Sequence, residues 1–172
     1  MKKNNWIVTI FTTTFLLSIV FSYATNIISV NANNIVTTFL IILIIAIGIL
    51  FDMIGAACLT SKEKTFHAMG AQKIKGAKMA IKLIRNNVKV SSIYNDIVGD
   101  ICGIISGGLG AVLAINLSLK TNINITIITI IISAIISALT VGGKAIFKNV
   151  GVKKADKIIF NLAKILSIFT KK

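Results

Sequence analysis

The stretch IVTTFLIILIIAIGILFDMIGAACLT, residues 35–60, decides the fold class of this chain. It carries a single charged residue, Asp52, and contains no Pro. At a helical rise of about 1.5 Å per residue, it is long enough to cross the hydrocarbon core of a bilayer, which is about 30 Å thick. The stretch therefore predicts a membrane-spanning helix.

The composition of the whole chain agrees with a membrane protein. Of its 172 residues, 55% are hydrophobic, 14% are charged and none is Pro. Soluble domains average about 45–50% apolar and about 25% charged residues. The charge density is too low for a soluble nucleic-acid-binding protein, and the apolar content is too high for a disordered chain. We therefore expect a single all-α, polytopic membrane domain over residues 1–172.

Breaks in the apolar pattern predict four transmembrane helices, over residues 6–30, 35–60, 92–119 and 123–143. The basic segments 62–88 and 145–170 are too polar to cross, yet their apolar residues recur at helical spacing. We expect amphipathic juxtamembrane helices, at the membrane surface or against the ends of the spans. The first apolar stripe comprises Phe66, Gly70, Ile74, Ala77, Ile81, Ile84 and Val88; the second comprises Ile158, Leu162, Ile165 and Phe169.

The basic residues predict the orientation in the membrane. With these four spans, every Lys and Arg except Lys120 falls on one side. The positive-inside rule makes that side cytoplasmic, so we expect a multi-pass protein of the cell membrane with both termini in the cytoplasm. Attraction to anionic lipid at this face accounts for the net charge of +14, and nucleic acid is not needed to explain it.

An alternative concerns the first predicted span. Residues 1–32 also fit a cleaved signal peptide, because Lys2 and Lys3 precede an apolar stretch that ends in Ser29-Val30-Asn31-Ala32. The apolar stretch is long for a signal peptide, so we favour a retained span. Cleavage would leave three spans with the same orientation.

The five acidic residues fall into two groups. Glu63 and Asp156 lie in the basic segments, where we expect them to be solvated partners of lysines. Asp52, Asp96 and Asp100 lie in or at the ends of predicted spans, where an ionised Asp costs about 2.5–3.5 kcal/mol. Acids at such positions indicate an ion or proton site.

Asp96 and Asp100 are four residues apart, so they share one face of the third span with Asn95 at its border. The same face continues through small residues that allow close helix approach: Ser92, Gly99, Gly103, Gly107 and Gly110. Two carboxylates in a tight interface repel each other unless a cation or proton lies between them. Carboxylate and amide oxygens suit hard cations such as Mg²⁺. Simple hydration of Asp96 or Asp100 near the interface stays open as the alternative.

Other chemistry has weaker support. Cys58, Cys102 and His67 match no zinc-site spacing; we expect the cysteines to be buried packing residues and His67 to be solvated. The chain contains no nucleophile elbow, HExxH motif or phosphate-binding glycine loop, so we expect neither an enzyme nor an organic cofactor.

From Phe51 the chain reads FDMIGAACLTSKEKTFHAMGAQKIKGAKMAIKLIRNNVKVSSIYNDIVGDI, which resembles the transmembrane domain of CNNM/CorC magnesium transporters. In that family a small-residue span end with Ala-Leu-x-Ser precedes a basic helix and an Asn-rich start of the next span. Cys58-Leu59-Thr60-Ser61 and Asn95-Asp96-Ile97-Val98-Gly99-Asp100 stand in these places. Of the family's final Glu-x-x-Pro-Lys, residues 140–144 keep only Lys144.

The resemblance, over about residues 36–165, implies a Mg²⁺ transporter that is a homodimer, with coupling to Na⁺. Asn95 matches a family ligand, whereas Thr140 stands where the family has Glu. The predicted metal ligands are thus Asn95, Asp96 and Asp100, faced by Asp52 and Thr140. The family's nucleotide-sensing CBS domains are not among these 172 residues, so we expect no regulation through them within the chain.

Two other function classes compete with transport. A non-transporting membrane scaffold or partner subunit would bind anionic lipid or another protein through its basic helices. A holin-like pore former fits the size and the basic termini, but not the intramembrane acids. Proximity of Asp52 and Thr140 to Asp96 or Asp100 would favour a cation site over the scaffold.

Overall fold

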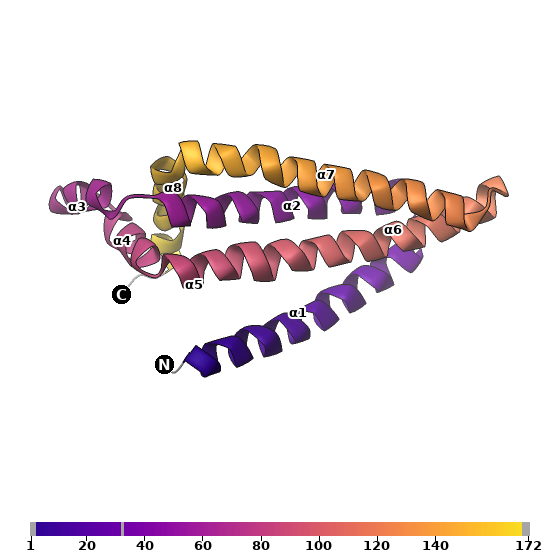
Figure 1. The fold of residues 1–172 in the computed structure, drawn as a ribbon, viewed down its shortest axis with the longest axis horizontal. Helices are drawn as coiled ribbons and strands as arrows, with labels where there is room; N and C mark the ends of the chain where they lie inside the picture. The colour runs from indigo at the N-terminus through magenta and orange to yellow at the C-terminus, as the bar shows by residue number, and fades with distance from the viewer. Residues whose placement is uncertain (1–2, 32, 170–172) are drawn as a thin grey trace. The chain divides into compact units, whose positions relative to one another are not determined.

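The computed structural model describes residues 3–31 and 33–169, and the side chains of residues 7–27 and 33–168. The described chain is almost entirely helical and contains no strand (Figure 1). Its elements are α1 (Lys3–Asn31), α2 (Asn34–Thr60), α3 (Glu63–Ala71), α4 (Ala77–Arg85), α5 (Asn87–Ser91), the π-helix η1 (Ser92–Gly99), α6 (Asp100–Thr121), α7 (Ile125–Lys153) and α8 (Ala155–Phe169).

Four helical segments are long and apolar enough to span a membrane, which confirms this part of the predicted fold. They are Ile7–Ile27 in α1, the whole of α2, the continuous run Asn87–Thr121, and α7. Insertion into a membrane, and the choice between a retained span and a signal peptide, stay predictions. Lys2, Ala32, Lys171 and Lys172, used in those predictions, lie outside the described residues.

The fourth span is longer than the sequence predicts, because α7 continues past residue 143 to Lys153. Gly143 does not end the helix; it packs against Ile49 of α2. Gly151 likewise lies close to Met53 of α2. Both glycines therefore serve close helix approach inside α7, and the second basic helix starts only at Ala155.

The chain forms two compact units. The first comprises residues 1–49 and 97–143, and the second comprises residues 50–96 and 144–172. The continuous helices α2 and α7 contribute residues to both. The prediction that the chain is one membrane domain stays a prediction, and the units are treated separately below.

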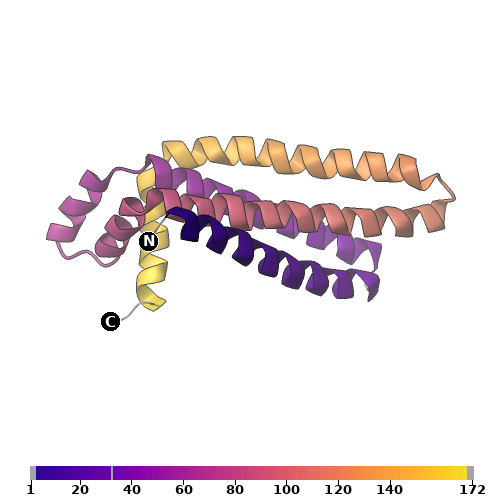
Figure 2. The ribbon, with the colours of Figure 1, turned by 60° about the horizontal axis from the view of Figure 1, so that its bottom comes forward.

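The core of the first unit is aliphatic. Ile41 and Ile45 of α2 pack with residues 97–113 and with Ile136 of α7. α1 lies against α6 (Figure 2). Many large apolar side chains on α1 and α7 remain exposed, as expected for helices that face lipid.

The glycine face predicted for the third span is only partly used. A Cβ at Gly110 would contact Ile132 and Ile136 of α7, and Gly48 of α2 approaches Cys102 and the carbonyl of Gly99. Gly103 and Gly107 have nothing within 4 Å of a Cβ position, so no helix of the described chain packs closely there.

In the second unit, the basic segment predicted as one helix over residues 62–88 is two helices joined by a turn. Lys73 and Gly76 in this turn have positive φ angles of 56° and 94°. The turn lets α4 fold back against α3 and pack on α8. Residues 87–91 then form α5 at the start of the third apolar run.

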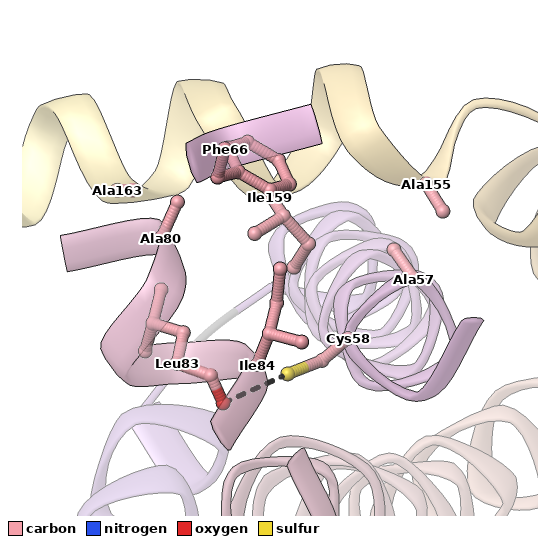
Figure 3. Packing of buried hydrophobic residues seen from close by; sticks show 9 residues of the cluster. All are labelled: Ala57, Cys58, Phe66, Ala80, Leu83, Ile84, Ala155, Ile159 and Ala163. Carbon is pink, nitrogen blue, oxygen red and sulfur yellow. Dashed lines mark hydrogen bonds between the residues drawn. The ribbon is translucent and has the colours of Figure 1, made fainter. Parts of the chain in front are cut away.

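The apolar sides of these helices pack on one another and on the end of α2 (Figure 3). The Cys58 thiol donates a hydrogen bond to the carbonyl of Leu83 at 3.6 Å. The cluster is Ala57, Cys58, Phe66, Ala80, Leu83, Ile84, Ala155, Ile159 and Ala163. The basic helices thus pack on the end of α2, as one of the two predictions requires, and their position at a membrane surface stays a prediction.

The predicted apolar stripes are partly wrong. Ile74 and Val88 are exposed, because Ile74 lies in the turn before α4 and Val88 follows the end of α4. Ala77 and Ile84 are buried as predicted, together with Ala80 and Leu83. In α8, Ile159 and Ala163 are buried while Ile165 is exposed, so the buried stripe is displaced around the helix. Phe169 belongs to the predicted stripe, but its side chain lies outside the described ones.

Candidate cation-binding site

Within the second unit, the structure brings together two of the five predicted ligands, Asp52 of α2 and Asn95 of η1. Asp52 is only 7% exposed. The Asn95 amide is oriented with its nitrogen toward Asp52, which satisfies both groups: Nδ2 donates to Oδ1 of Asp52 at 2.8 Å and to its backbone oxygen at 3.1 Å. A buried carboxylate thus meets a neutral amide, 43 positions further along the sequence.

Gly55 makes this approach possible. It lies one helical turn after Asp52, and a Cβ at this position would come within 3.1–3.3 Å of the Asn95 side chain. Next to the pair, the rings of Phe51 and Tyr94 stack with centroids 5.4 Å apart. These neighbouring contacts orient η1 on α2, so that Asn95 points at Asp52.

The π-helical winding of residues 92–99 is itself a notable feature of this site. π-helical turns are rare and often lie at functional sites, because they change the direction of side chains relative to a regular α-helix. Asn95 and Asp96 both lie in this segment. The side chain of Asn95 is half-buried against α2, whereas that of Asp96 is exposed.

Two of the other predicted ligands, Asp100 and Thr140, belong to the first unit. Asp100 begins α6 in the first unit, and its side chain is exposed. Thr140 lies on α7 in the first unit, and its hydroxyl oxygen is buried with no hydrogen-bond partner among the described residues. Across the described chain, no group of three or more His, Cys, Asp or Glu side chains is arranged to hold a metal ion.

Sequence reasoning missed a second polar centre, the carboxylate of Asp156 in α8. Its Oδ1 accepts hydrogen bonds from the Ser61 hydroxyl at 2.6 Å and from the Lys62 backbone N–H at 3.1 Å. Its Oδ2 accepts one from the Thr65 hydroxyl at 2.9 Å. Asp156 is therefore not simply solvated as expected, although one lysine, Lys62, is among its partners. The one sequence signal was the run Thr60-Ser61, which supplies hydroxyls just before α3.

The hydrogen bonds at Asp156 also set its charge state. Burial alone would raise the pKa of this carboxyl group, but the donors Ser61, Lys62 and Thr65 outweigh burial and lower it below its ordinary value. Asp156 is therefore an anion at neutral pH.

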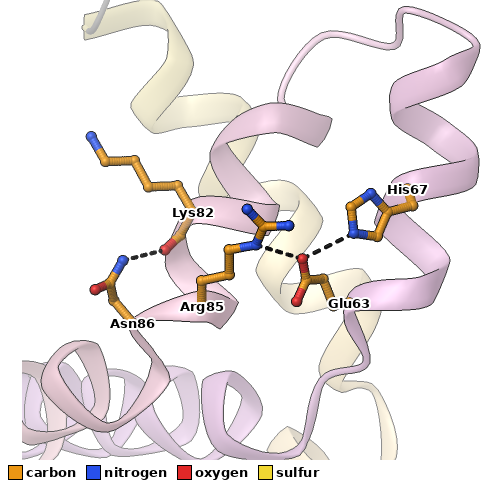
Figure 4. A network of polar contacts seen from close by, with 5 residues as sticks. All are labelled: Glu63, His67, Lys82, Arg85 and Asn86. Carbon is orange, nitrogen blue, oxygen red and sulfur yellow. Dashed lines mark hydrogen bonds and ion pairs between the residues drawn. The ribbon is translucent and has the colours of Figure 1, made fainter.

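Glu63 forms a separate, exposed network (Figure 4). Its Oε1 accepts hydrogen bonds from Arg85 Nε at 2.6 Å and from His67 Nε2 at 2.9 Å. The hydrogen bond from Arg85 is the main cause that lowers the Glu63 pKa. Its partners are thus Arg85 and His67, not the lysines that were expected. His67 is exposed, as predicted.

The cysteines are free thiols. Cys58 is fully buried in the core of the second unit, which confirms the predicted packing role. Cys102 is half-buried beside Gly48.

Comparison of the chain with protein-family models, with curated proteins and with solved structures finds no match. The resemblance to CNNM/CorC transporters therefore stays a prediction from the residues quoted above.

Proposed function

We propose that this chain binds a divalent cation, with Mg²⁺ as the first choice, and moves it across the cell membrane. The observation that carries the proposal is the buried carboxylate of Asp52 held against the amide of Asn95. An acid in an apolar span is costly, and such acids typically serve ion or proton pathways.

The spacing of the polar atoms is compatible with a hard cation. The amide atom of Asn95 that faces Asp52 lies 2.8 and 3.1 Å from two Asp52 oxygens. Two neighbouring oxygens bound to Mg²⁺ at about 2.1 Å, at a right angle, lie about 3.0 Å apart. A half-turn of the amide would present its oxygen in place of the nitrogen, and the cation would replace the two hydrogen bonds. Mg²⁺ usually keeps several waters, so few protein ligands suffice.

The proposed ligand set is therefore narrower than the one the sequence predicts. Asp52 and Asn95 form its centre, and Gly55 provides the room for Asn95. Asp96, with its exposed side chain, serves as the contrast that separates this proposal from the sequence prediction.

The test is thermal unfolding of the purified full chain in detergent across a series of MgCl₂ concentrations, with CaCl₂ and MnCl₂ in parallel. A ligand of the native state raises the unfolding midpoint by mass action. We expect a saturable rise for the wild type and for Asp96→Asn, and none for Asp52→Asn or Asn95→Ala. Equal rises in all four proteins would contradict binding at this pair. Loss in Asp96→Asn alone would return the site to the predicted third-span carboxylates.

Transport is then tested in proteoliposomes that contain a Mg²⁺-sensitive dye. Uptake by the wild type that Asp52→Asn abolishes is the expected result. Binding without uptake would leave a cation-binding membrane protein that does not transport. Coupling to Na⁺, implied by the CNNM/CorC resemblance, is tested by varying the Na⁺ gradient in the same vesicles.

The proposed topology places both termini in the cytoplasm, supported by the distribution of Lys and Arg. Reporter fusions to the C-terminus and to the Asn122 loop would check it, because only the first should report a cytoplasmic location. We also propose a homodimer, for which Gly103 and Gly107 leave an open helix face. Cross-linking in the membrane would test it.

A scaffold that binds anionic lipid or a protein is the second candidate function. It is favoured by the packing of α3, α4 and α8, whose apolar sides face inward and leave their lysines exposed. Wild-type binding of Mg²⁺ that depends on Asp52 would favour the first candidate.

A further inference from the structure

The start of α8 and the end of α2 border an open pocket of about 490 Å³ within the second unit. Four of its lining residues are lysines, and none of them belongs to the proposed cation site. The lining residues are Thr60, Lys62, Val152, Lys153, Lys154, Ala155, Asp156 and Lys157. A volume of this size accommodates a small ligand or a lipid headgroup.

The fold brings these lysines together from distant parts of the sequence. Lys154 is the only residue between α7 and α8, so Lys153, Lys154 and Lys157 surround a sharp helical corner. The hydrogen bond from the Lys62 backbone N–H to Asp156 holds the fourth lysine at the same place. All four lysine side chains are exposed.

The acid in the pocket wall is already engaged. Both oxygens of Asp156 accept hydrogen bonds from Ser61, Lys62 or Thr65 at the start of α3. One carboxylate and four ammonium groups leave an excess of three positive charges around the pocket. Like charges gathered in one concavity repel each other, and a bound anion would relieve this repulsion.

The position of the pocket favours a phosphate group as that anion. It adjoins the ends of α2 and α7, two helices apolar enough to span a membrane, and therefore the level of lipid headgroups. Basic pockets at this level in membrane proteins bind phosphate-bearing headgroups.

We propose that the pocket formed by Lys62, Lys153, Lys154 and Lys157 binds one phosphate group, from an anionic lipid headgroup or from free phosphate. This proposal is independent of the cation site, and each can fail without the other.

The test measures binding to the purified full chain in a neutral detergent, by native mass spectrometry and by thermal shift. The probes are dioctanoyl phosphatidic acid, dioctanoyl phosphatidylglycerol, inorganic phosphate and pyrophosphate. Dioctanoyl phosphatidylcholine, whose headgroup has no net charge, is the control lipid. The pocket variant is Lys153→Gln/Lys154→Gln/Lys157→Gln. The matched control is Lys64→Gln/Lys75→Gln/Lys78→Gln, which removes the same charge from exposed lysines of α3, α4 and the turn between them.

We expect saturable, one-to-one binding of at least one phosphate probe, weakened tenfold or more in the pocket variant and less than twofold in the control. Binding of the two anionic lipids alone would assign the phosphate to a headgroup, and binding of inorganic phosphate or pyrophosphate would assign it to a soluble anion. Equal weakening in the two triple variants would overturn the proposal, because bulk charge would then explain the binding. Binding of phosphatidylcholine as tight as that of the anionic lipids, or no saturable binding, would also overturn it. Should the triple variant fail to fold, the single Lys154→Gln variant should still weaken binding several-fold.

Discussion

The carboxylate of Asp156 accepts a 2.6 Å hydrogen bond from the hydroxyl of Ser61, although 95 positions separate the two residues in the sequence. The same carboxylate accepts hydrogen bonds from residues at the start of α3. The N-cap residue of α3, Lys62, makes no side-chain capping hydrogen bond of its own. Asp156 thus supplies, from α8, an acceptor for the backbone N–H of this N-cap residue, which in a capping box comes from a side chain of the same helix.

Asp156→Asn should lower the free energy of unfolding by about 1–3 kcal/mol, because it replaces a charged acceptor of several hydrogen bonds with a neutral amide. Denaturant or thermal unfolding in detergent would measure the change. Glu63→Gln is the matched control, since it neutralises an exposed carboxylate whose partners are Arg85 and His67. A loss as large for Glu63→Gln as for Asp156→Asn would contradict the capping role.

The stability of the protein should fall at acidic pH through Asp156. Its hydrogen bonds hold the folded-state pKa below the ordinary value of about 3.9. A carboxylate with a depressed pKa contributes its full stabilisation above the unfolded-state pKa, and loses it as the pH falls through the folded-state pKa. Unfolding midpoints measured from pH 7 to pH 3 should therefore drop less steeply for Asp156→Asn than for the wild type. The midpoint of the variant should still fall somewhat with pH, because Arg85 also lowers the pKa of Glu63. Parallel plots of unfolding midpoint against pH for the two proteins would argue against Asp156 as a source of the pH dependence.

Gly76→Ala should destabilise the second unit by about 1–2 kcal/mol, because Gly76 has a φ of 94°, which L-residues adopt at a cost. A Cβ there would also lie 3.2 Å from the backbone of Lys164 in α8. Gly70→Ala is the control, since a Cβ at Gly70 meets only the end of Ile81 at 4.0 Å. The control should be neutral or stabilising, because Ala is a better helix former. Unfolding midpoints of the two variants would decide, and a loss equal in both would contradict the turn geometry.

Gly151→Ala should cost about 1–3 kcal/mol, because a Cβ at this position would lie 2.6 Å from the carbonyl oxygen of Met53. A backbone atom of a packed helix cannot move aside as a flexible side chain can. Gly142→Ala, on the same helix, has nothing within 4 Å of its Cβ position and should fold as the wild type does. Comparable midpoints for these two variants would show that α7 does not approach α2 at Gly151.

The four apolar helices were predictable because they depend on local composition. A run such as residues 35–60 can satisfy its backbone in an apolar environment only as a helix, whatever its neighbours. The ends of the helices were harder to predict from the sequence. Gly is common at the ends of helices, yet Gly143 lies within α7, because its small size serves packing against Ile49.

Only the types of residue in the candidate site were predictable from the sequence. Acids within predicted spans and a neighbouring amide indicated a cation site, and Asp52 and Asn95 were among its predicted ligands. Helical spacing also placed Asp96 and Asp100 on the site face, because it assumes regular α-helix. The π-helical winding of residues 92–99 changes which side chains point inward, and Asp96 is exposed.

The amino-acid sequence by itself determined the all-helical class, the four apolar segments and the basic character of the segments between and after them, because each depends on residues close together in the chain. The tertiary structure alone decided that Asn95 meets Asp52 over Gly55, that Asp156 caps α3, and that Lys62 lies beside the lysines of the α8 corner. These contacts join residues 40 or more positions apart. They depend on where turns and π-helical winding direct each helix, which the period of the local pattern does not encode.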